Sequence, residues 1–273
     1  MALVSSVHVT AVRRLTPHTT RVTFTGDGLD TLTRWPDQQL KLCFPRPGQS
    51  EPRIPAEHPA DVMRWYQAFM AIPEPERPWM RSYTVRHLRP GSAEFDVDFV
   101  LHDTPGPATE WAAGARVGDT LARYGPARQY ARPLLRGDDH LFAGDLAALP
   151  AIATLLESLP DPATAQVFIE VPDLADAQDL PHPITWLPRG STPPADSTLL
   201  LEAVRSARTI PATVAWIAAE ATITRTLRRH LVDRGIPKPR IEFTGYWRHT
   251  LTQDDAPTPE DLTDAQERVA RDG

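Results

Sequence analysis

Apolar and polar residues alternate along the first half of the chain, and this pattern predicts short β-strands. In Glu94–Leu101, three acidic residues alternate with phenylalanine and valine, which is the period of a strand with one buried face. Further strands are expected at Val7–Leu15, Thr19–Thr25, Gln39–Phe44, Ser82–Arg86 and Thr120–Tyr124. One helix, Ala60–Met70, lies in a proline-rich excursion between them. About six strands with one short helix favour a small antiparallel barrel.

Strands alternate with helices after Arg136-Gly137-Asp138, and this order predicts an α/β domain. Strands are expected at Leu141–Ala143, Ala165–Val171, Ile184–Leu187, Thr213–Ala218 and Arg240–Trp247, and helices at Leu146–Leu159, Leu199–Ser206 and Thr222–Arg234. Such alternation gives a mostly parallel sheet with helices on both faces, which binds ligands at the carboxyl ends of its strands. The predicted architecture is an antiparallel β-barrel (residues 1–133), a Rossmann-like α/β domain (134–250) and an acidic tail (251–273). We expect the tail to be loose apart from a helix at Pro259–Arg271.

Proline is the unusual feature of the composition. The 273 residues include 29 prolines, which disfavours long uninterrupted helices. No apolar stretch approaches the ~18 residues of a membrane helix, and the N-terminus lacks the basic start and apolar run of a secretory signal. The single cysteine, Cys43, has no partner for an internal disulfide. We expect a soluble, cytoplasmic protein that does not insert into a membrane, and we also expect a monomer.

Negative charge is concentrated at the C-terminus. The net charge is −6, and residues 254–273, with seven acidic residues and two arginines, contribute −5 of it. The rest of the chain is close to neutral, which argues against a general nucleic-acid-binding protein. Only two of the 29 basic residues are lysines, Lys41 and Lys238, so these two positions stand out. The nine histidines show no metal-ligand spacing, and no metal site is expected.

The stretch Arg81-Ser82-Tyr83-Thr84 is a first candidate for ligand binding. On a strand, Arg81 and Tyr83 point to one face and the other two residues to the opposite face. One face would then offer a guanidinium for a phosphate and a ring for stacking on a planar cofactor. The alternative is an ordinary strand with a surface arginine.

A helix start at Pro107 is the second candidate. Proline suits the first helical position, and the backbone N–H groups of such a start bind anions, with the Thr109 hydroxyl beside them. A purely structural helix start is the alternative, because many helices begin in this way with nothing bound.

Two further stretches lie where an α/β sheet binds its ligands. Gly144–Ala153 follows the first strand of the domain, at the dinucleotide position, but lacks the Gly-x-Gly-x-x-Gly fingerprint. Gly245–Arg248 ends the last strand with Tyr246, Trp247 and an arginine. These aromatic residues would either cover a flat ligand or pack at the domain junction.

In this order, the motifs closely resemble those of the siderophore-interacting, FAD-binding ferric reductases, a branch of the ferredoxin-NADP reductase superfamily. The matching stretches are Arg81–Arg86 (Arg-Ser-Tyr-Thr-Val-Arg), Asp98–Ala112, Gly144–Ala153, Trp216–Ala221 (Trp-x-Ala-x-Glu-Ala) and Gly245–Arg248 (Gly-Tyr-Trp-Arg). The resemblance covers nearly the whole chain from Val7 to Arg248. It implies an FAD-binding barrel followed by a nicotinamide-binding α/β domain.

The resemblance also implies roles for individual residues. The implied cofactor-binding residues are Arg81, Ser82, Tyr83, Thr84, Asp98, Val100, His102, Gly106, Pro107, Ala108, Thr109, Asp145, Glu220 and Trp247. Among them, Arg81 and the helix start at Gly106–Thr109 would hold the FAD phosphates, Tyr83 would stack on the flavin ring and Thr84 would lie near its reactive nitrogen. Val100 and His102 would line the cofactor, and Trp247 would shield the flavin.

Other residues are implied for the electron donor and the substrate. Asp145 and Glu220 would help to shape the nicotinamide site, whereas Lys41 and Arg248 would form a basic pocket for an anionic ferric siderophore. Two departures from the family pattern fall on the nicotinamide side: Leu146 stands in an acidic position and Ala219 replaces a glycine. The donor is therefore left open between NADPH, NADH and reduced ferredoxin. If NADPH is used, an arginine must contact its 2′-phosphate, and Arg189, Arg205 and Arg208 are the candidates.

The expected activity is the reduction of siderophore-bound Fe(III) to Fe(II). The hard oxygen donors of a siderophore bind Fe(II) more weakly than Fe(III), so the iron is released. FAD would perform the redox chemistry, so no side chain is expected to act as a nucleophile or general base. Two alternatives stay open. One is a flavin reductase that passes electrons to a protein partner, and the other is a flavin- and siderophore-binding protein without turnover.

Overall fold

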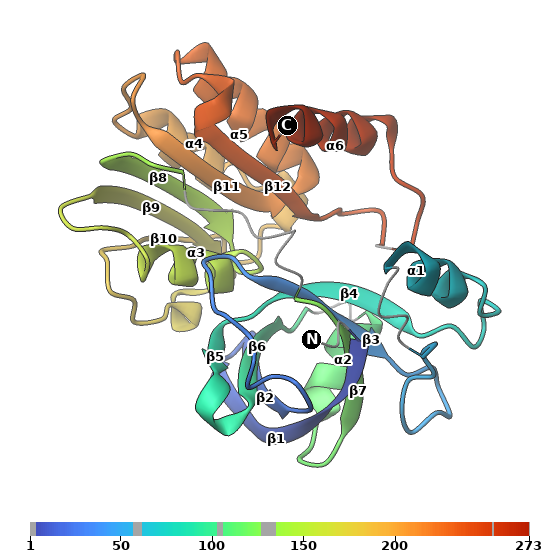
Figure 1. The fold of residues 1–273 in the computed structure, drawn as a ribbon. Helices are drawn as coiled ribbons and strands as arrows, with labels where there is room; N and C mark the ends of the chain where they lie inside the picture. The colour runs from blue at the N-terminus through green and yellow to red at the C-terminus, as the bar shows by residue number, and fades with distance from the viewer. Residues whose placement is uncertain (1–3, 57–61, 103–105, 127–134, 253, 273) are drawn as a thin grey trace.

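The computed structural model describes residues 4–56, 62–102, 106–126, 135–252 and 254–272. Figure 1 shows a barrel below and an α/β domain above. The expected boundary at residues 133–134 lies outside the described residues, and so do residues 103–105 of the predicted phosphate-binding stretch. No helix in the described ranges is long and apolar enough to cross a membrane.

The barrel is an antiparallel sheet of seven strands in the order β4-β3-β7-β1-β2-β6-β5. Its strands are β1 (Val4–Thr16), β2 (Thr19–Thr25), β3 (Gln39–Phe44), β4 (Trp79–Thr84), β5 (His87–Arg89), β6 (Glu94–Val100) and β7 (Thr120–Tyr124). The outermost strands, β4 and β5, are consecutive in the chain, so the sheet curls round on itself. This confirms the predicted antiparallel barrel.

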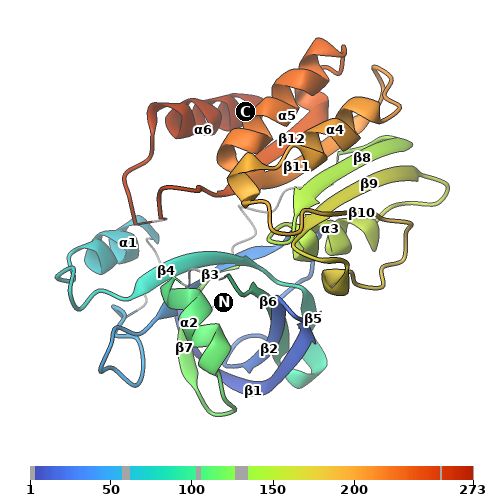
Figure 2. The ribbon, with the colours of Figure 1, turned by 180° about the vertical axis from the view of Figure 1, so that it is seen from behind.

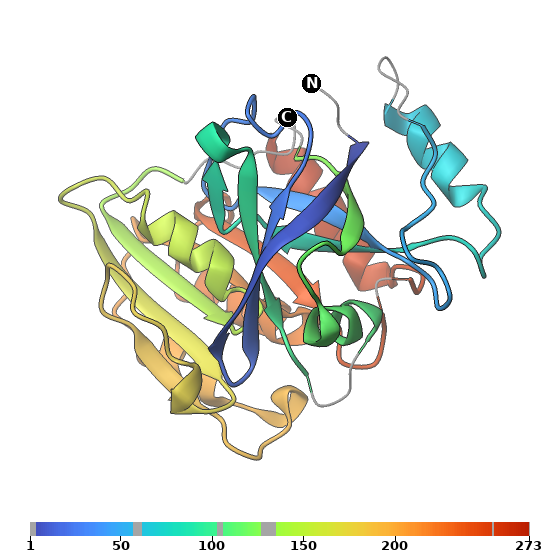
Figure 3. The same ribbon diagram turned by 90° about the horizontal axis from the view of Figure 1, so that it is seen from below.

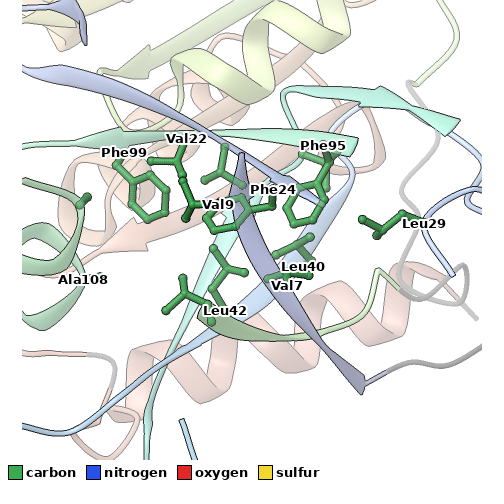
Figure 4. Close-up of a cluster of buried hydrophobic side chains, with 14 of the residues drawn as sticks. Val7, Val9, Val22, Phe24, Leu29, Leu40, Leu42, Phe95, Phe99 and Ala108 are labelled. Carbon is green, nitrogen blue, oxygen red and sulfur yellow. The ribbon is translucent and has the colours of Figure 1, made fainter. Parts of the chain in front are cut away.

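Alternate residues of these strands fill the barrel with apolar side chains. Figure 4 shows Val7, Phe24, Leu42 and Phe99 among the residues that meet there, and all four are almost completely buried. Burial of each large apolar side chain stabilises the fold by about 1.5–3 kcal/mol. Helix α2 (Pro107–Gly114) packs on this core through the ring of Trp111, whose centroid lies 5.6 Å from that of Phe44.

Helix α1 (Val62–Met70) stands beside the barrel, as Figure 3 shows in cyan. Its Trp65 ring stacks on Tyr124 of β7, with 4.8 Å between the ring centroids, and its Phe69 is buried with the thiol of Cys43. The expected first residues of this helix, from Ala60, lie outside the described residues. The described part confirms a helix within the excursion.

The α/β domain is a parallel sheet in the order β10-β9-β8-β11-β12. Its strands are β8 (Asp139–Asp145), β9 (Thr164–Val171), β10 (Thr185–Pro188), β11 (Val214–Glu220) and β12 (Ile241–Trp247), and its helices are α3 (Leu149–Leu156), α4 (Leu199–Ser206) and α5 (Ala221–Asp233). One apolar cluster packs α3 against the sheet, and a second packs α4 and α5 against it. The structure thus confirms a parallel sheet covered by helices.

Several boundaries differ from the predictions, most of them by one to three residues. β4 runs over Trp79–Thr84 instead of Ser82–Arg86, because the Arg86 N–H already pairs with Asp96 of β6 at the corner that leads into β5. The three-residue strand β5 was not predicted. Helix α3 starts at Leu149, three residues later than expected, because the Asp145 carboxylate accepts N–H groups in a preceding turn.

The C-terminal helix is confirmed, as α6 (Pro259–Asp272). The described residues before it, 251–252 and 254–258, form no helix or strand, and the expectation that this part of the tail is loose stays a prediction. There the Asp255 carboxylate accepts the Thr252 N–H at 2.6 Å and the Thr252 hydroxyl at 2.9 Å, and the Arg248 guanidinium donates to the Asp261 carboxylate. These hydrogen bonds link described residues of the segment between β12 and α6 (Figure 2).

A buried carboxylate fixes the barrel to the α/β domain. The Asp176 side chain is fully buried and accepts the Thr16 hydroxyl at 2.8 Å and the His18 N–H at 2.9 Å, and the His18 Nδ1 lies 2.7 Å away. Glu157, the C-cap residue of helix α3, pairs with Arg34 and with Arg86, the latter at 2.7 Å. Although burial alone would raise it, these two arginines hold the pKa of Glu157 below its usual range.

Removal of the Asp176 carboxylate should loosen this junction. We expect Asp176→Ala to lower the free energy of unfolding by roughly 3 kcal/mol, because it leaves buried donors at Thr16 and His18 without an acceptor. Thermal or urea unfolding at neutral pH measures the change. Asp179→Ala removes an exposed carboxylate three residues away and should stay within about 0.5 kcal/mol of the wild type; equal effects of the two changes would contradict the assignment.

Candidate functional site

The pairing of β4 with β3 decides where the Arg-Ser-Tyr-Thr side chains face. Arg81 pairs with Leu42, and Tyr83 pairs with Leu40. Both leucines are buried in the barrel core, and cross-strand partners lie on the same face of a sheet. The structure therefore confirms that Arg81 and Tyr83 share a face of β4.

The Tyr83 ring packs against other aromatic side chains of the barrel. Its centroid lies 4.6 Å from that of Phe99 and 6.2 Å from that of Phe44. Burial raises the pKa of the Tyr83 hydroxyl, against an opposing effect of the nearby Arg81, so the phenol is neutral at physiological pH. These neighbours hold the ring in one position on β4.

The Arg81 guanidinium is paired with the carboxylate of Asp254. Its Nη1 and Nη2 donate to Oδ1 and Oδ2 of Asp254 at 2.9 and 2.5 Å, and Nη1 also donates to the Met80 carbonyl at 3.0 Å. The Arg81 side chain is only 11% exposed, whereas that of Asp254 is 51% exposed. A two-pronged contact of this kind is the geometry with which arginine binds carboxylates and phosphates.

Lys41 and Ser82 lie on the opposite face of the same two strands. They are cross-strand partners, and the Lys41 amine donates to the Ser82 hydroxyl at 3.0 Å. Burial lowers the pKa of Lys41, and the nearby Arg81 lowers it further, while Cys43 opposes this. The amine is therefore a half-buried cation close to β4.

Helix α2 begins without a side-chain cap. Its N-cap residue, Gly106, is extended, and Pro107 and Ala108 open the first turn. A Cβ at Gly106 would meet no atom of the described residues within 4 Å, so these residues leave space beside this helix end. The Thr109 hydroxyl is 3.5 Å from the Val100 carbonyl, which ties the first turn to β6.

The predicted residues on and after β6 have separate surroundings. Asp98 is buried and accepts two hydrogen bonds from Arg21, at 2.6 and 2.8 Å, so its carboxylate already has a protein partner. Val100 is partly buried against the apolar cluster of helix α3. Thr84, at the end of β4, is buried, and His102 is exposed.

Asp145 and Trp247 meet at the carboxyl edge of the parallel sheet. The Trp247 Nε1–H donates to Oδ2 of Asp145 at 2.6 Å, while Oδ1 accepts the N–H groups of Ala147 at 3.0 Å and Ala148 at 3.3 Å. Burial raises the pKa of Asp145 to about 6, although the Trp247 bond and the two N–H groups act in the opposite direction. The carboxyl therefore titrates near neutral pH.

Glu220, at the end of the neighbouring strand β11, caps helix α5. Its Oε2 accepts the N–H groups of Thr222 at 2.6 Å and Ile223 at 3.1 Å, and its Oε1 lies 3.4 Å from the His249 N–H. Glu220 also pairs with Trp247 in the register of β11 and β12. The structure thus brings Asp145, Glu220 and Trp247 to one edge, as the topology of the sheet predicted.

Arg248 is enclosed by the C-terminal segment. It donates to the Asp261 carboxylate at 2.9 Å and to the carbonyls of Thr252, Asp255 and Ala256, the last two at 3.4 and 3.3 Å. Its guanidinium therefore organises the tail, and any contact with a substrate would be additional. Lys41 and Arg248 therefore have different partners in the structure: Lys41 donates to Ser82, and Arg248 donates to the tail.

Two groups of residues at the site were missed from the sequence. One is Asp254, which lies 173 residues after its partner Arg81 and shows only as part of an acidic tail. The other comprises Asp37 and Gln39 of the barrel, which bind Tyr246 of the α/β domain. The Tyr246 hydroxyl donates to Asp37 at 3.1 Å, and the Gln39 amide donates to the Tyr246 hydroxyl at 3.2 Å. Tyr246 thus packs at the domain junction, which is one of its two predicted uses.

The groups on this surface fit the phosphates of FAD. The Asp254 carboxylate shows that the Arg81 guanidinium takes an oxyanion with both terminal nitrogens, and phosphate oxygens are acceptors of the same kind. The uncapped start of α2 and the space that the described residues leave at Gly106 allow backbone N–H groups to face an anion. Tyr83 adds an aromatic ring on the face of Arg81.

Comparison with known proteins gives matches along both domains. The family described as siderophore-interacting FAD-binding domain matches residues 8–130, and the siderophore-interacting protein family matches residues 137–250. An uncharacterized protein of Mycobacterium tuberculosis (strain H37Rv) is 35% identical over 263 residues, with 90% of each chain covered. The ferric vibriobactin reductase ViuB of Vibrio cholerae is 38% identical over 178 residues, which are 62% of this chain and 60% of ViuB.

A solved structure supports the same relationship. The crystal structure of a siderophore utilization protein from T. fusca superposes with a TM-score of 0.80 and 32% sequence identity. The match covers 93% of this chain and 97% of that protein. Barrel, sheet and the order of the two domains are therefore shared over nearly the full length.

The Asp145–Trp247 hydrogen bond should respond to pH. Above pH 6 the carboxylate is charged and holds the indole N–H strongly, and as the pH falls through about 6 it takes up a proton and the bond loses its charge assistance. We expect the fluorescence difference between wild type and Trp247→Phe to titrate with a midpoint near pH 6. Asp145→Asn should abolish this titration, and Trp186→Phe should leave it in place. A difference that is constant from about pH 5 to 7 would contradict the shifted pKa.

Proposed function

Because the chain belongs to the siderophore-interacting FAD-binding family, we propose that it is a flavoprotein that reduces Fe(III) bound by a siderophore and so releases Fe(II). The observation that carries this proposal is the nearly buried Arg81 guanidinium, which holds an oxyanion beside the Tyr83 ring on β4. A relative that bears the name of a ferric reductase supports the reaction type.

The cofactor would be held mainly by the barrel. Arg81 would bind phosphate oxygens in the place that the Asp254 carboxylate occupies, and the start of α2 at Gly106–Thr109 would add backbone donors. Tyr83 would offer its ring as a stacking surface, supported from behind by Phe99. Ser82 and Thr84 of β4, Val100 at the end of β6 and His102 after it would contribute smaller contacts.

When bound, FAD supplies the conversion of a two-electron donation into the single-electron transfers that reduction of Fe(III) requires. The residues of this chain bind and orient the reactants. Trp247, fixed by Asp145, would cover the flavin from the side of the α/β domain, while Asp145 and Glu220 shape the edge at which a nicotinamide would enter. No side chain needs to act as a nucleophile.

The half-buried Lys41 would attract an anionic ferric siderophore. The chain has a net charge of −6, so local positive charge must offset repulsion of an anionic substrate. Lys41 and Arg81 place two cations near β4, which is consistent with the coulombic lowering of the Lys41 pKa by Arg81. Arg248 would contribute to the same siderophore pocket only together with the C-terminal segment, because its guanidinium donates to Asp261 there.

For the electron donor we propose NADPH or NADH, with reduced ferredoxin as the alternative. Of the three candidate arginines for a 2′-phosphate, Arg189 follows β10 at the carboxyl edge, where its N–H donates to the Val171 carbonyl at 2.9 Å. Arg208 instead donates to Asp139 at the start of β8, on the opposite edge, and Arg205 lies in the last turn of α4. The position of Arg189 favours it as the contact.

An anaerobic assay separates the proposed activity from its alternatives. The purified chain with bound FAD receives NADPH or NADH, flavin absorbance is followed, and a ferric siderophore is then added with a ferrous trap. We expect bleaching by one nucleotide, followed by trapped Fe(II). Bleaching without Fe(II) would favour a reductase with a protein partner. No bleaching with either nucleotide would favour ferredoxin as the donor or a binding protein without turnover.

Loss of the Arg81 side chain should weaken FAD binding. A hydrogen bond to a charged group contributes about 1.5–3 kcal/mol, so we expect Arg81→Ala to raise the dissociation constant for FAD roughly tenfold or more. Titration of the flavin-free protein, followed by quenching of flavin fluorescence, measures this. Arg53→Ala removes an exposed arginine of the same domain as the matched control. Equal affinities of the two variants would show that Arg81 is not a phosphate ligand.

A further inference from the structure

The chain segment between β12 and α6 crosses from the α/β domain to the barrel. Figures 1 and 2 both show it descending towards β4 and α1 before it returns to α6. We call its described residues, 248–252 and 254–258, the strap. Helix α6, which follows the strap, lies on α5, where Arg225 pairs with Asp261 at 3.4 Å and with Asp264 at 3.2 Å. Both ends of the strap therefore belong to the α/β domain.

The turn of the strap is built from its own hydrogen bonds. The Asp255 carboxylate accepts the Thr252 N–H and hydroxyl, and these bonds lower the pKa of Asp255. The Thr252 hydroxyl accepts the Asp254 N–H at 3.2 Å, and Arg248 donates to carbonyls on either side. None of these bonds uses the Asp254 carboxylate, which instead accepts the Arg81 guanidinium.

The two partners of the Arg81–Asp254 ion pair are not equivalent. Arg81 is 11% exposed and Asp254 is 51% exposed. If the pair opens, Asp254 returns to water at little cost, but the nearly buried guanidinium loses its counter-ion, which is unfavourable unless another anion takes its place. Arg81 therefore always requires an oxyanion, and Asp254 is the one that the chain itself provides.

We propose that Asp254 competes with the phosphates of FAD for Arg81, so that the strap withdraws from β4 when the cofactor binds. The inference rests on the proposed function, in which Arg81 holds those phosphates. Asp254 fills both terminal nitrogens of the guanidinium, and even a phosphate approaching the remaining N–H groups would meet the negative charge of the carboxylate at close range. The diphosphate of FAD carries more charge than one carboxylate, so it prevails when present, and Asp254 keeps Arg81 paired when it is absent.

Neutralisation of Asp254 should therefore tighten FAD binding. We expect Asp254→Asn to lower the dissociation constant for FAD by up to about fivefold, given the ~0.2–1 kcal/mol measured for exposed ion pairs. The full-length protein is freed of flavin and titrated with FAD by fluorescence quenching, and circular dichroism checks that each variant is folded. Glu260→Gln removes one negative charge from the first turn of α6, where Glu260 is exposed, and should leave the affinity within about twofold.

Riboflavin distinguishes competition for the phosphates from simple covering of the cleft. It has the flavin ring without a phosphate, so its affinity should be the same for wild type and Asp254→Asn. Equal tightening of riboflavin and FAD would overturn the proposal, because the strap would then act as a steric cover. An unchanged or weaker FAD affinity in Asp254→Asn, with saturable binding to the wild type, would overturn it alone. Absence of saturable FAD binding to the wild type would overturn the proposed function and this inference together.

Discussion

Carboxylates of the second half of the chain, held by donors of the barrel, determine how the two domains meet. Asp176 accepts the hydroxyl of Thr16 and the N–H of His18, and Glu157 accepts two arginines of the barrel. A carboxylate withdrawn from water without such donors would be strongly destabilising, so each of these contacts has a preferred geometry. The site lies in the same junction. The position of β4 relative to the carboxyl edge of the parallel sheet therefore follows from contacts that contain no ligand.

The carboxyl edge itself is arranged differently from a sheet with a glycine-rich nucleotide loop. In such loops the N–H groups at the helix start are free to bind phosphates. Here Asp145 occupies the N–H groups before α3, and Glu220 occupies those of the first turn of α5. If the donor is a nucleotide, as proposed, its phosphates would not meet these occupied N–H groups, and the side chain of Arg189 lies at the same edge.

Much of the architecture could be predicted from the sequence, because the period of apolar residues in strands such as Thr19–Thr25 and the strand–helix order after residue 138 are local properties. The shared face of Arg81 and Tyr83 also follows from strand geometry alone. The three-residue β5 was beyond reach, since so short a strand has no period. The ion pair of Arg81 with Asp254 and the bond of Trp247 to Asp145 were missed for a different reason: each joins residues that only the tertiary fold brings together, 173 and 102 positions apart.

That separation also has a consequence for the order of events during synthesis. All seven strands of the barrel precede residue 125, whereas Asp254 is made 173 residues after Arg81. At about 5–20 residues per second, a ribosome needs on the order of ten seconds or more to pass from Arg81 to Asp254. During this interval the nascent barrel presents its guanidinium with no internal counter-ion. A flavin loaded onto the growing chain therefore meets no competitor, because Asp254 is made only after the cofactor is in place.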